Sequence, residues 1–150
     1  MKNRKELLSK KLYHYLRALP DGPAPTTADY VAKGADLVTS EAILTLREML
    51  PDIRKKLYQV HAPTAFVQSV ELLAIYFEET LGAPASVWPA RQQTAFALLY
   101  FVKGYDRIPD SIPEIGYLDD AAVINQVIEN HRQTLREHWA HRNWAWPSTV

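Results

Sequence analysis

The stretch from Ala95 to Val102 carries no polar side-chain group except the Tyr100 hydroxyl. A helix with this sequence is apolar all round, so the rest of the chain has to cover it on every side. Pro89 suits the first turn of such a helix, and Gly104 suits its end, because glycine adopts the left-handed conformation without a steric penalty. The stretch therefore predicts a buried central helix near residues 90–103, against which the other elements pack.

The other segments show the spacing of amphipathic helices rather than the alternation of strands. Apolar residues recur three and four positions apart, which places them on one face of a helix. The helices predicted in this way span residues 3–19, 26–38, 40–50, 63–81 and 118–139. Ser40 is expected to cap the third of them and Pro51 to interrupt it, with residues 52–60 as either a separate turn or a kinked extension. The predicted fold is all-α, a compact bundle of five or six helices around the buried central helix.

Length and composition indicate one domain over residues 1–150, with residues 141–150 as a tail. A chain of this size buries roughly 70% of the surface that it exposes when unfolded. The formal net charge is zero, so nothing draws the whole molecule to nucleic acid, and no such partner is expected. The chain has no cysteine, which excludes disulfides, thiolate zinc sites and cysteine nucleophiles. A secretory signal and a membrane-spanning stretch are also not seen, so a cytoplasmic protein is expected.

The segment Tyr100 to Asp120, with the sequence YFVKGYDRIPDSIPEIGYLDD, joins the central helix to the last one. Pro109 and Pro113 prevent a regular helix within it. Apolar residues nevertheless recur through the segment, and a solvated loop would not need them. We therefore expect this corner to fold back onto the core.

The same residues carry a family resemblance. The pattern consists of Tyr100-Phe101, Asp106, Ile108-Pro109-Asp110, Ile112-Pro113 and Gly116-Tyr117-Leu118-Asp119-Asp120. It resembles the signature of the YkvA-like family of bacterial proteins, a domain of unknown function, and would place a YkvA-like core at about residues 90–140. The resemblance implies a small helical protein, sometimes membrane-associated, with no established chemistry. It supplies no catalytic residue.

Four carboxylates in this corner form the first candidate site: Asp106, Asp110, Asp119 and Asp120. Brought together, they could hold a divalent cation such as Mg²⁺ or Ca²⁺ through oxygen ligands and activate water. The alternative is structural, because aspartates accept hydrogen bonds from free backbone N–H groups at turns and helix starts and can pair with Arg107 or another base. The spacing is not that of an EF-hand loop. We favour the structural interpretation.

Two further clusters lie near the C-terminus. His131, His138 and His141, with Glu137, could offer an imidazole–carboxylate zinc site, but a solvated helix face is the preferred interpretation. Three tryptophans follow, Trp139, Trp144 and Trp146. They indicate either an interface with protein or lipid headgroups, or a tail that folds back onto the domain, and we favour the second.

Three functions remain open on this basis. The glycines are isolated and no nucleophile elbow is present, so the leading hypothesis is a non-enzymatic helical interaction module that binds a protein partner or a second copy, with no catalytic residue and no cofactor. The first alternative is a divalent-metal-binding protein or hydrolase centred on the four aspartates. The second is a protein peripheral to the inner membrane, whose Lys- and Arg-rich first helix lies on an anionic surface.

Overall fold

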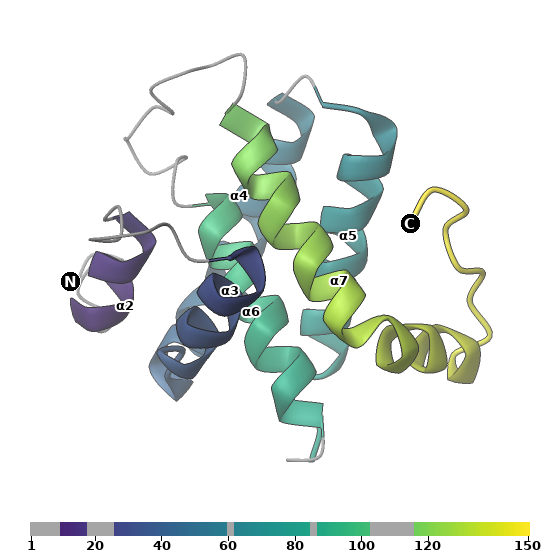
Figure 1. Ribbon diagram of the computed structural model, residues 1–150. Coiled ribbons are helices and arrows are strands. Elements are labelled where there is room, and N and C mark those ends of the chain that lie inside the picture. Colours follow the sequence, from purple (N-terminus) through teal and green to yellow (C-terminus); the bar gives the residue numbers. More distant parts are fainter. Residues whose placement is uncertain (1–9, 18–25, 60–61, 85–86, 103–115) are drawn as a thin grey trace.

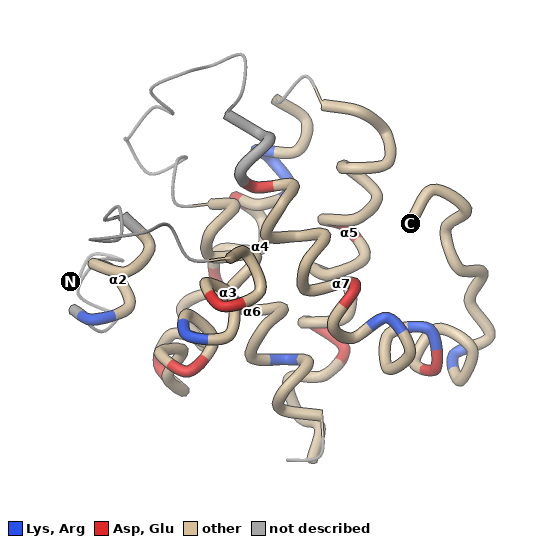
Figure 2. Tube along the Cα trace, in the orientation of Figure 1, with Lys and Arg blue, Asp and Glu red and all other residues tan. Residues whose placement is uncertain are grey.

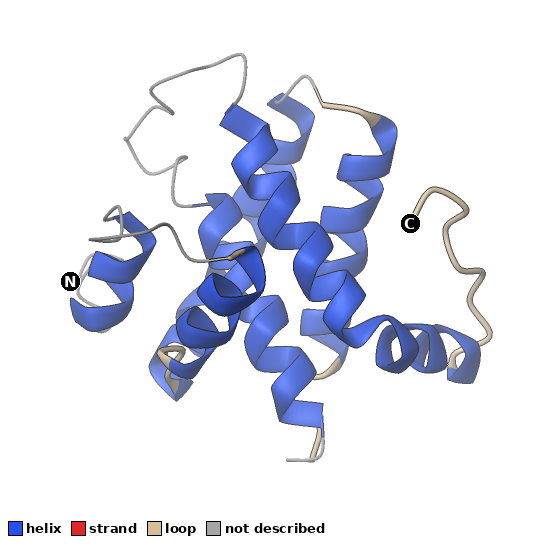
Figure 3. Cartoon of the chain, viewed as in Figure 1, coloured by secondary structure: helices blue, strands red, loops and turns tan. Residues whose placement is uncertain are grey.

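The computed structural model describes residues 10–17, 26–59, 62–84, 87–102 and 116–150. Within these ranges the chain forms six helices and no strand (Figures 1 and 3). The helices are α2 Lys10–Arg17, α3 Thr27–Asp36, α4 Ser40–Gln59, α5 Thr64–Glu79, α6 Trp88–Val102 and α7 Gly116–His141. The predicted all-α bundle is confirmed.

Helix α6 is the centre of the bundle. It packs against α3, α4, α5 and α7, so it is covered on several sides, as its apolar sequence requires (Figure 1). Its second half is buried almost continuously from Thr94 to Phe101 and Val102, with Tyr100 half-buried. Pro89 lies in its first turn, as predicted.

Helix α3 approaches α6 closely at one glycine. A Cβ atom added to Gly34 would lie 2.2 Å from Cε1 of Phe96, and the Phe96 ring is fully buried. Thr26 caps α3, because its side chain accepts a hydrogen bond from the Asp29 N–H at 3.1 Å. A residue without a side chain is therefore required where the two helices meet.

Helix α2 lies beside α3 through a reciprocal tyrosine contact. The Tyr15 hydroxyl donates to the Tyr30 carbonyl at 2.6 Å, the Tyr30 hydroxyl donates to the Tyr15 carbonyl at 3.2 Å, and the two rings stack. Burial raises the pKa of both hydroxyls. Leu12 and Leu16 are buried on the same side. Part of the apolar face predicted for the first helix therefore packs within the protein, while residues 3–9, 18 and 19 lie outside the described ranges.

Helix α4 corrects two sequence predictions. Its cap is Thr39 rather than Ser40, because the Thr39 hydroxyl accepts from the Ala42 N–H at 3.1 Å while Ser40 is already the first helical residue. Pro51 does not interrupt it, and the helix runs through this residue to Gln59. Tertiary packing of Ile53 and Leu57, both buried, outweighs the loss of one backbone hydrogen bond at the proline.

Helix α7 begins at Gly116, two residues before the predicted start, and bends at His131, where φ is −126° and ψ is 20°. The bend was not predicted. Beyond His141, Asn143 takes a left-handed conformation with φ of 57°, and the Trp144 N–H donates to the Trp139 carbonyl at 2.9 Å, which ends the helix as a Schellman motif does. The chain then returns beside α5, where Thr149 hydrogen-bonds Gln68 (Figure 1). Part of the predicted tail at 141–150 is thus in contact with the bundle.

Basic and acidic residues occur together on α3, α4 and α7, whereas α2 and α6 carry basic residues only (Figure 2). None of those helices combines the length and the apolar character that crossing a bilayer demands.

Candidate functional site

The four aspartates of the first candidate site do not all fall within the described residues. Asp106 and Asp110 lie outside them, and for Asp119 only the helical backbone in the first turn of α7 is described. Asp120 is described fully, and its side chain is buried, with a residue exposure of 3%. Because α7 begins at Gly116, Asp119 and Asp120 lie inside the helix rather than at its cap.

Asp120 meets a lysine from another helix. Its Oδ2 atom lies 4.0 Å from Nζ of Lys56, which is itself only 8% exposed and reaches over from α4. Lys56 Nζ also donates to the Phe101 carbonyl and lies 4.5 Å from the centroid of the Phe101 ring. This carbonyl is at the C-terminal end of α6, where backbone acceptors lack helical partners and a cation is favourable. One lysine therefore ties α4, α6 and α7 together.

This ion pair bears on both interpretations of the aspartates. The structural interpretation required a basic partner for the aspartates. For Asp120 this partner is Lys56 of α4, which lies outside the segment from Tyr100 to Asp120. A lysine ammonium beside the carboxylate also competes electrostatically with a metal cation. Among the described residues, no group of three or more His, Asp or Glu side chains could hold a metal ion. The four-aspartate metal site stays a prediction, because Asp106 and Asp110 lie outside those residues.

The three histidines do not converge in the structure. His131 occupies the bend of α7, half-buried, and burial lowers its pKa. His138 lies against α5, with Nε2 at 3.5 Å from Oε1 of Glu79, while His141 is exposed at the end of α7. Their different surroundings give no shared metal site among the described residues. The solvated-face prediction holds for His141 only.

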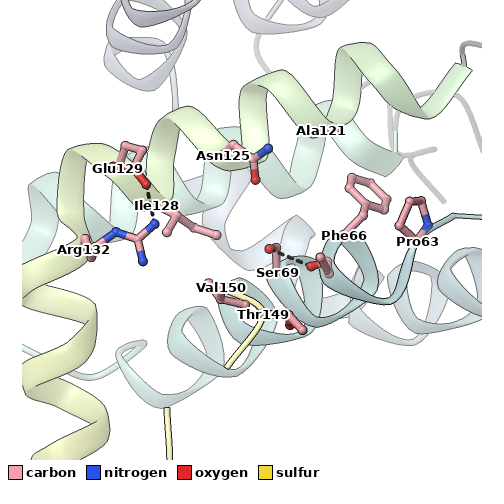
Figure 4. A pocket seen from close by; sticks show the side chains of 11 residues that line it. Pro63, Phe66, Ser69, Ala121, Asn125, Ile128, Glu129, Arg132, Thr149 and Val150 are labelled. Atoms are coloured by element: carbon pink, nitrogen blue, oxygen red, sulfur yellow. Dashed lines mark hydrogen bonds and ion pairs between the residues drawn. The ribbon is translucent and has the colours of Figure 1, made fainter. Parts of the chain in front are cut away.

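A groove of about 330 Å³ lies between α5, α7 and the returning chain end (Figure 4). It is open, and its volume is at the lower limit of ordinary ligand pockets. Several of its polar side chains already have partners: Arg132 pairs with Glu129, Ser69 donates to the Ala65 carbonyl, and Thr149 bonds Gln68. Much of the polar lining of this groove is therefore already engaged in contacts within the protein.

The most distinctive surface surrounds the C-terminal turn of α5. We call it the Trp88–Trp144 surface and define it by the two exposed tryptophans, which are 48% and 38% exposed, and by four polar residues, Glu79, Arg91, His138 and Arg142. The Arg91 guanidinium carbon lies 5.3 Å from the Trp88 ring, and that of Arg142 lies 5.0 Å from the Trp144 ring. Each exposed tryptophan thus stacks on an arginine.

Both arginines are held by the same turn of α5. Arg91 Nη1 donates to the carbonyls of Thr80 and Leu81, at 3.4 and 3.3 Å. Arg142 Nε lies 2.8 Å from Oε1 of Glu79. The carbonyls of Thr80 and Leu81 follow the last residue of α5, and backbone carbonyls at a helix C-terminus attract cations. The end of α5 therefore contacts both cation–aromatic pairs.

The other C-terminal tryptophans fold back, as the sequence analysis favoured. Trp139 is buried, and its ring meets those of Trp144 and Trp146 edge-to-face. Trp146 is half-buried and donates from Nε1 to the Val150 carbonyl at 3.1 Å. Trp88 was not singled out from the sequence as a site residue. The sequence could have predicted that Trp88 is exposed, since a tryptophan directly before Pro89 at a helix start has few neighbours to cover it.

Comparison with known proteins gives one family-level similarity. A model of a family described as "Protein of unknown function (DUF1232)" matches residues 93–125, roughly a fifth of the chain. The matched segment runs from α6 into α7 and contains Phe101 and Asp120. No curated protein and no solved structure gives a significant match. The chain is thus similar to a family whose function is itself unknown.

Proposed function

We propose that the protein is a YkvA-like helical module that acts by binding another protein or a second copy of itself, without catalysis. The Trp88–Trp144 surface carries this proposal. Tryptophan and arginine are the residues most often found at the centres of binding interfaces, where few side chains supply most of the affinity. The YkvA-like assignment is supported by the family match at 93–125, which overlaps the aspartate–proline pattern.

The rigidity of the surface favours binding. Ordering a long side chain at an interface costs about 0.5–1.5 kcal/mol. Arg91 and Arg142 are already held by backbone carbonyls and by Glu79, and each fixes the tryptophan stacked on it. Much of the conformational entropy of these side chains is therefore already lost in the free protein, so binding a partner costs less. On α4, Tyr58 is 85% exposed, and within the described part of the chain no arginine lies over its ring.

The test compares the wild-type chain with a Trp88→Ala/Trp144→Ala double variant. Light scattering after size-exclusion chromatography gives the oligomeric state, and quantitative mass spectrometry identifies proteins retained from lysate. We expect either a dimer that the double variant converts to a monomer, or one identified partner that the double variant no longer retains. Tyr58→Ala is the matched control, because it removes an exposed aromatic ring from α4 and should change neither result. A monomer with the same retained proteins in all three chains would refute the proposal.

The divalent-cation and membrane alternatives keep separate tests. Calorimetric titration with Mg²⁺, Ca²⁺, Mn²⁺ and Zn²⁺ tests the four-aspartate site, and Asp106→Asn should abolish any binding that depends on it. For the membrane alternative, Leu12 and Leu16 are buried against the bundle, so α2 would have to leave α3 before this face could enter lipid. Binding to anionic vesicles that does not change on deletion of residues 1–19 would rule out this helix as the anchor.

A further inference from the structure

Two buried polar atoms at the Trp88–Trp144 surface, the Tyr76 hydroxyl and Arg91 Nε, have no hydrogen-bond partner among the described residues. The nearby His138 Nε2 lies 3.5 Å from Oε1 of Glu79. The Tyr76 side chain is almost fully enclosed, at 1% exposure. Buried polar groups in native proteins nearly always have partners, and each exception calls for an explanation. Two exceptions in one place indicate a recognition site rather than two independent defects.

Contacts between the three side chains place these atoms in one cluster. The His138 ring meets the Tyr76 ring edge-on, with centroids 5.3 Å apart. Burial raises the pKa of Tyr76 above its usual value, and the positive charge of Arg91 nearby lowers it in part. Arg91 in turn stacks on Trp88, and His138 lies 6.2 Å from the Trp144 ring, centroid to centroid. The cluster therefore runs between the two exposed tryptophans.

The chemistry of the cluster selects a negatively charged acceptor. A tyrosine hydroxyl donates one hydrogen bond, and the arginine guanidinium only donates and stays charged. Two donors, one of them a permanent cation, are matched best by a carboxylate, whose two oxygens fit the planar N–H groups of arginine. Arg142 adds a second cation at the edge of the cluster, half of it exposed, where it pairs with Glu79.

We infer that the Trp88–Trp144 surface receives an acidic segment of a partner protein, and that Tyr76 and Arg91 donate hydrogen bonds to one of its carboxylates. This inference rests on the proposed function and names the chemistry of the partner. A single projecting side chain, unlike a flat surface, can reach donors that are buried below the protein surface. A lipid surface would instead need cations that are broadly exposed, and Arg91 is half-buried with its guanidinium tied to two carbonyls.

The structural alternative is that Arg91 serves only to cap α5. Its bonds to Thr80 and Leu81 use Nη1 and leave Nε unexplained, and they give no role to the Tyr76 hydroxyl. The recognition role and the purely structural role predict different effects of Tyr76→Phe on stability. This change removes the hydroxyl and keeps the ring. If the hydroxyl waits for a partner, the free protein becomes more stable without it, because a buried unsatisfied donor is lost.

The experiment uses the full chain with poly-L-glutamate as the carboxylate probe. We follow the Nε–H signal of Arg91 by NMR and the tryptophan fluorescence during titration. We expect the Arg91 signal to shift on binding, and Tyr76→Phe to weaken binding about tenfold or more while its melting temperature rises by about 2–4 °C. Arg91→Gln should lose binding, whereas Arg47→Gln, which removes the same charge from an exposed position of α4, should retain it.

Three results would overturn the inference. The first is an Nε–H signal of Arg91 whose chemical shift does not change when poly-L-glutamate is added. The second is Tyr76→Phe that binds as tightly as the wild type or melts at a lower temperature, which would show that the hydroxyl is already satisfied. The third is a shift with phosphatidylglycerol vesicles or inorganic phosphate but not with poly-L-glutamate. None of these results would refute the proposed function. If the Trp88→Ala/Trp144→Ala variant loses a dimer or a partner, that function is supported whatever the titration with poly-L-glutamate shows.

Discussion

The buried pair of Lys56 and Asp120 gives the sharpest prediction about stability. We consider Lys56→Met, which keeps most of the side-chain length and apolar contact while removing the charge. Two losses follow from the structure: Asp120 loses the cation at 4.0 Å, and the Phe101 carbonyl loses its lysine donor. Breaking a buried ion pair from one side costs about 3–5 kcal/mol, because a charge remains in a poorly solvated place.

The distance of 4.0 Å between Lys56 Nζ and Asp120 Oδ2 sets the size of the expected loss of stability. At 4 Å and an effective dielectric constant of about 20, two unit charges attract by about 4 kcal/mol. Since domains of this kind are stable by only about 5–15 kcal/mol, the variant should lose a large share of its stability. For a chain of this length the loss corresponds to a fall in melting temperature of about 6–20 °C.

Urea denaturation followed by far-UV circular dichroism measures the effect, with an unchanged denaturant slope as the condition for comparing free energies. Lys55→Met is the matched control: it removes the same charge from the neighbouring, exposed position and should change stability by less than about 0.5 kcal/mol. The double variant Lys56→Met/Asp120→Asn should be more stable than the sum of the two single losses predicts, by about 1–3 kcal/mol. A loss below about 1 kcal/mol for Lys56→Met, or additive losses in the double variant, would refute the reasoning.

Three further predictions concern other parts of the bundle. Gly34→Ala should cost about 1–3 kcal/mol in a thermal melt, because its Cβ atom would overlap the enclosed Phe96 ring; an unshifted melt would contradict the tight contact of α3 with α6. Tyr15→Phe should cost about 0.5–1.5 kcal/mol and increase protease cleavage near α2, since it removes the bond to the Tyr30 carbonyl. His131 has a pKa below its unfolded value, so the unfolded chain binds more protons and stability falls as the pH drops below about 6.5. His131→Gln should lose less stability than the wild type between pH 7 and pH 5, and equal losses would argue against this role.

Local sequence patterns were sufficient to predict the helices and the centre of the bundle. The run from Ala95 to Val102 predicted a covered helix, and this part of α6 is buried except for the half-buried Tyr100. The helical spacing of Phe66, Val70, Leu73, Phe77 and Leu81 predicted a buried face for the helix at residues 63–81; the first four are buried, and Leu81, beyond the end of α5, is half-buried. These predictions succeed because the spacing of apolar residues along one helix is enough to determine which face is buried.

Features that depend on contacts between distant residues were missed. Lys56 lies on the buried side of α4 between Ile53 and Leu57, and a lone lysine in an apolar stripe signals a buried partner without identifying it. Its partners, Asp120 and the Phe101 carbonyl, come from other helices. The bend at His131 likewise has no proline or glycine to announce it. Pairing across helices follows from the packing, which one-dimensional periodicity does not contain.

The two ends of α6 differ in a way that separates what holds the bundle together from what the bundle presents to a partner. At the C-terminal end, Lys56 satisfies the Phe101 carbonyl and pairs with Asp120, and this corner lies within or against the family match at 93–125. At the N-terminal end, Arg91 leaves Nε unsatisfied beside the unsatisfied Tyr76 hydroxyl, and both residues precede the matched segment. Satisfied buried charges stabilise a fold, whereas unsatisfied donors at a surface require a partner. The matched segment thus contains two of the three members of the corner, Phe101 and Asp120, and neither Arg91 nor Tyr76.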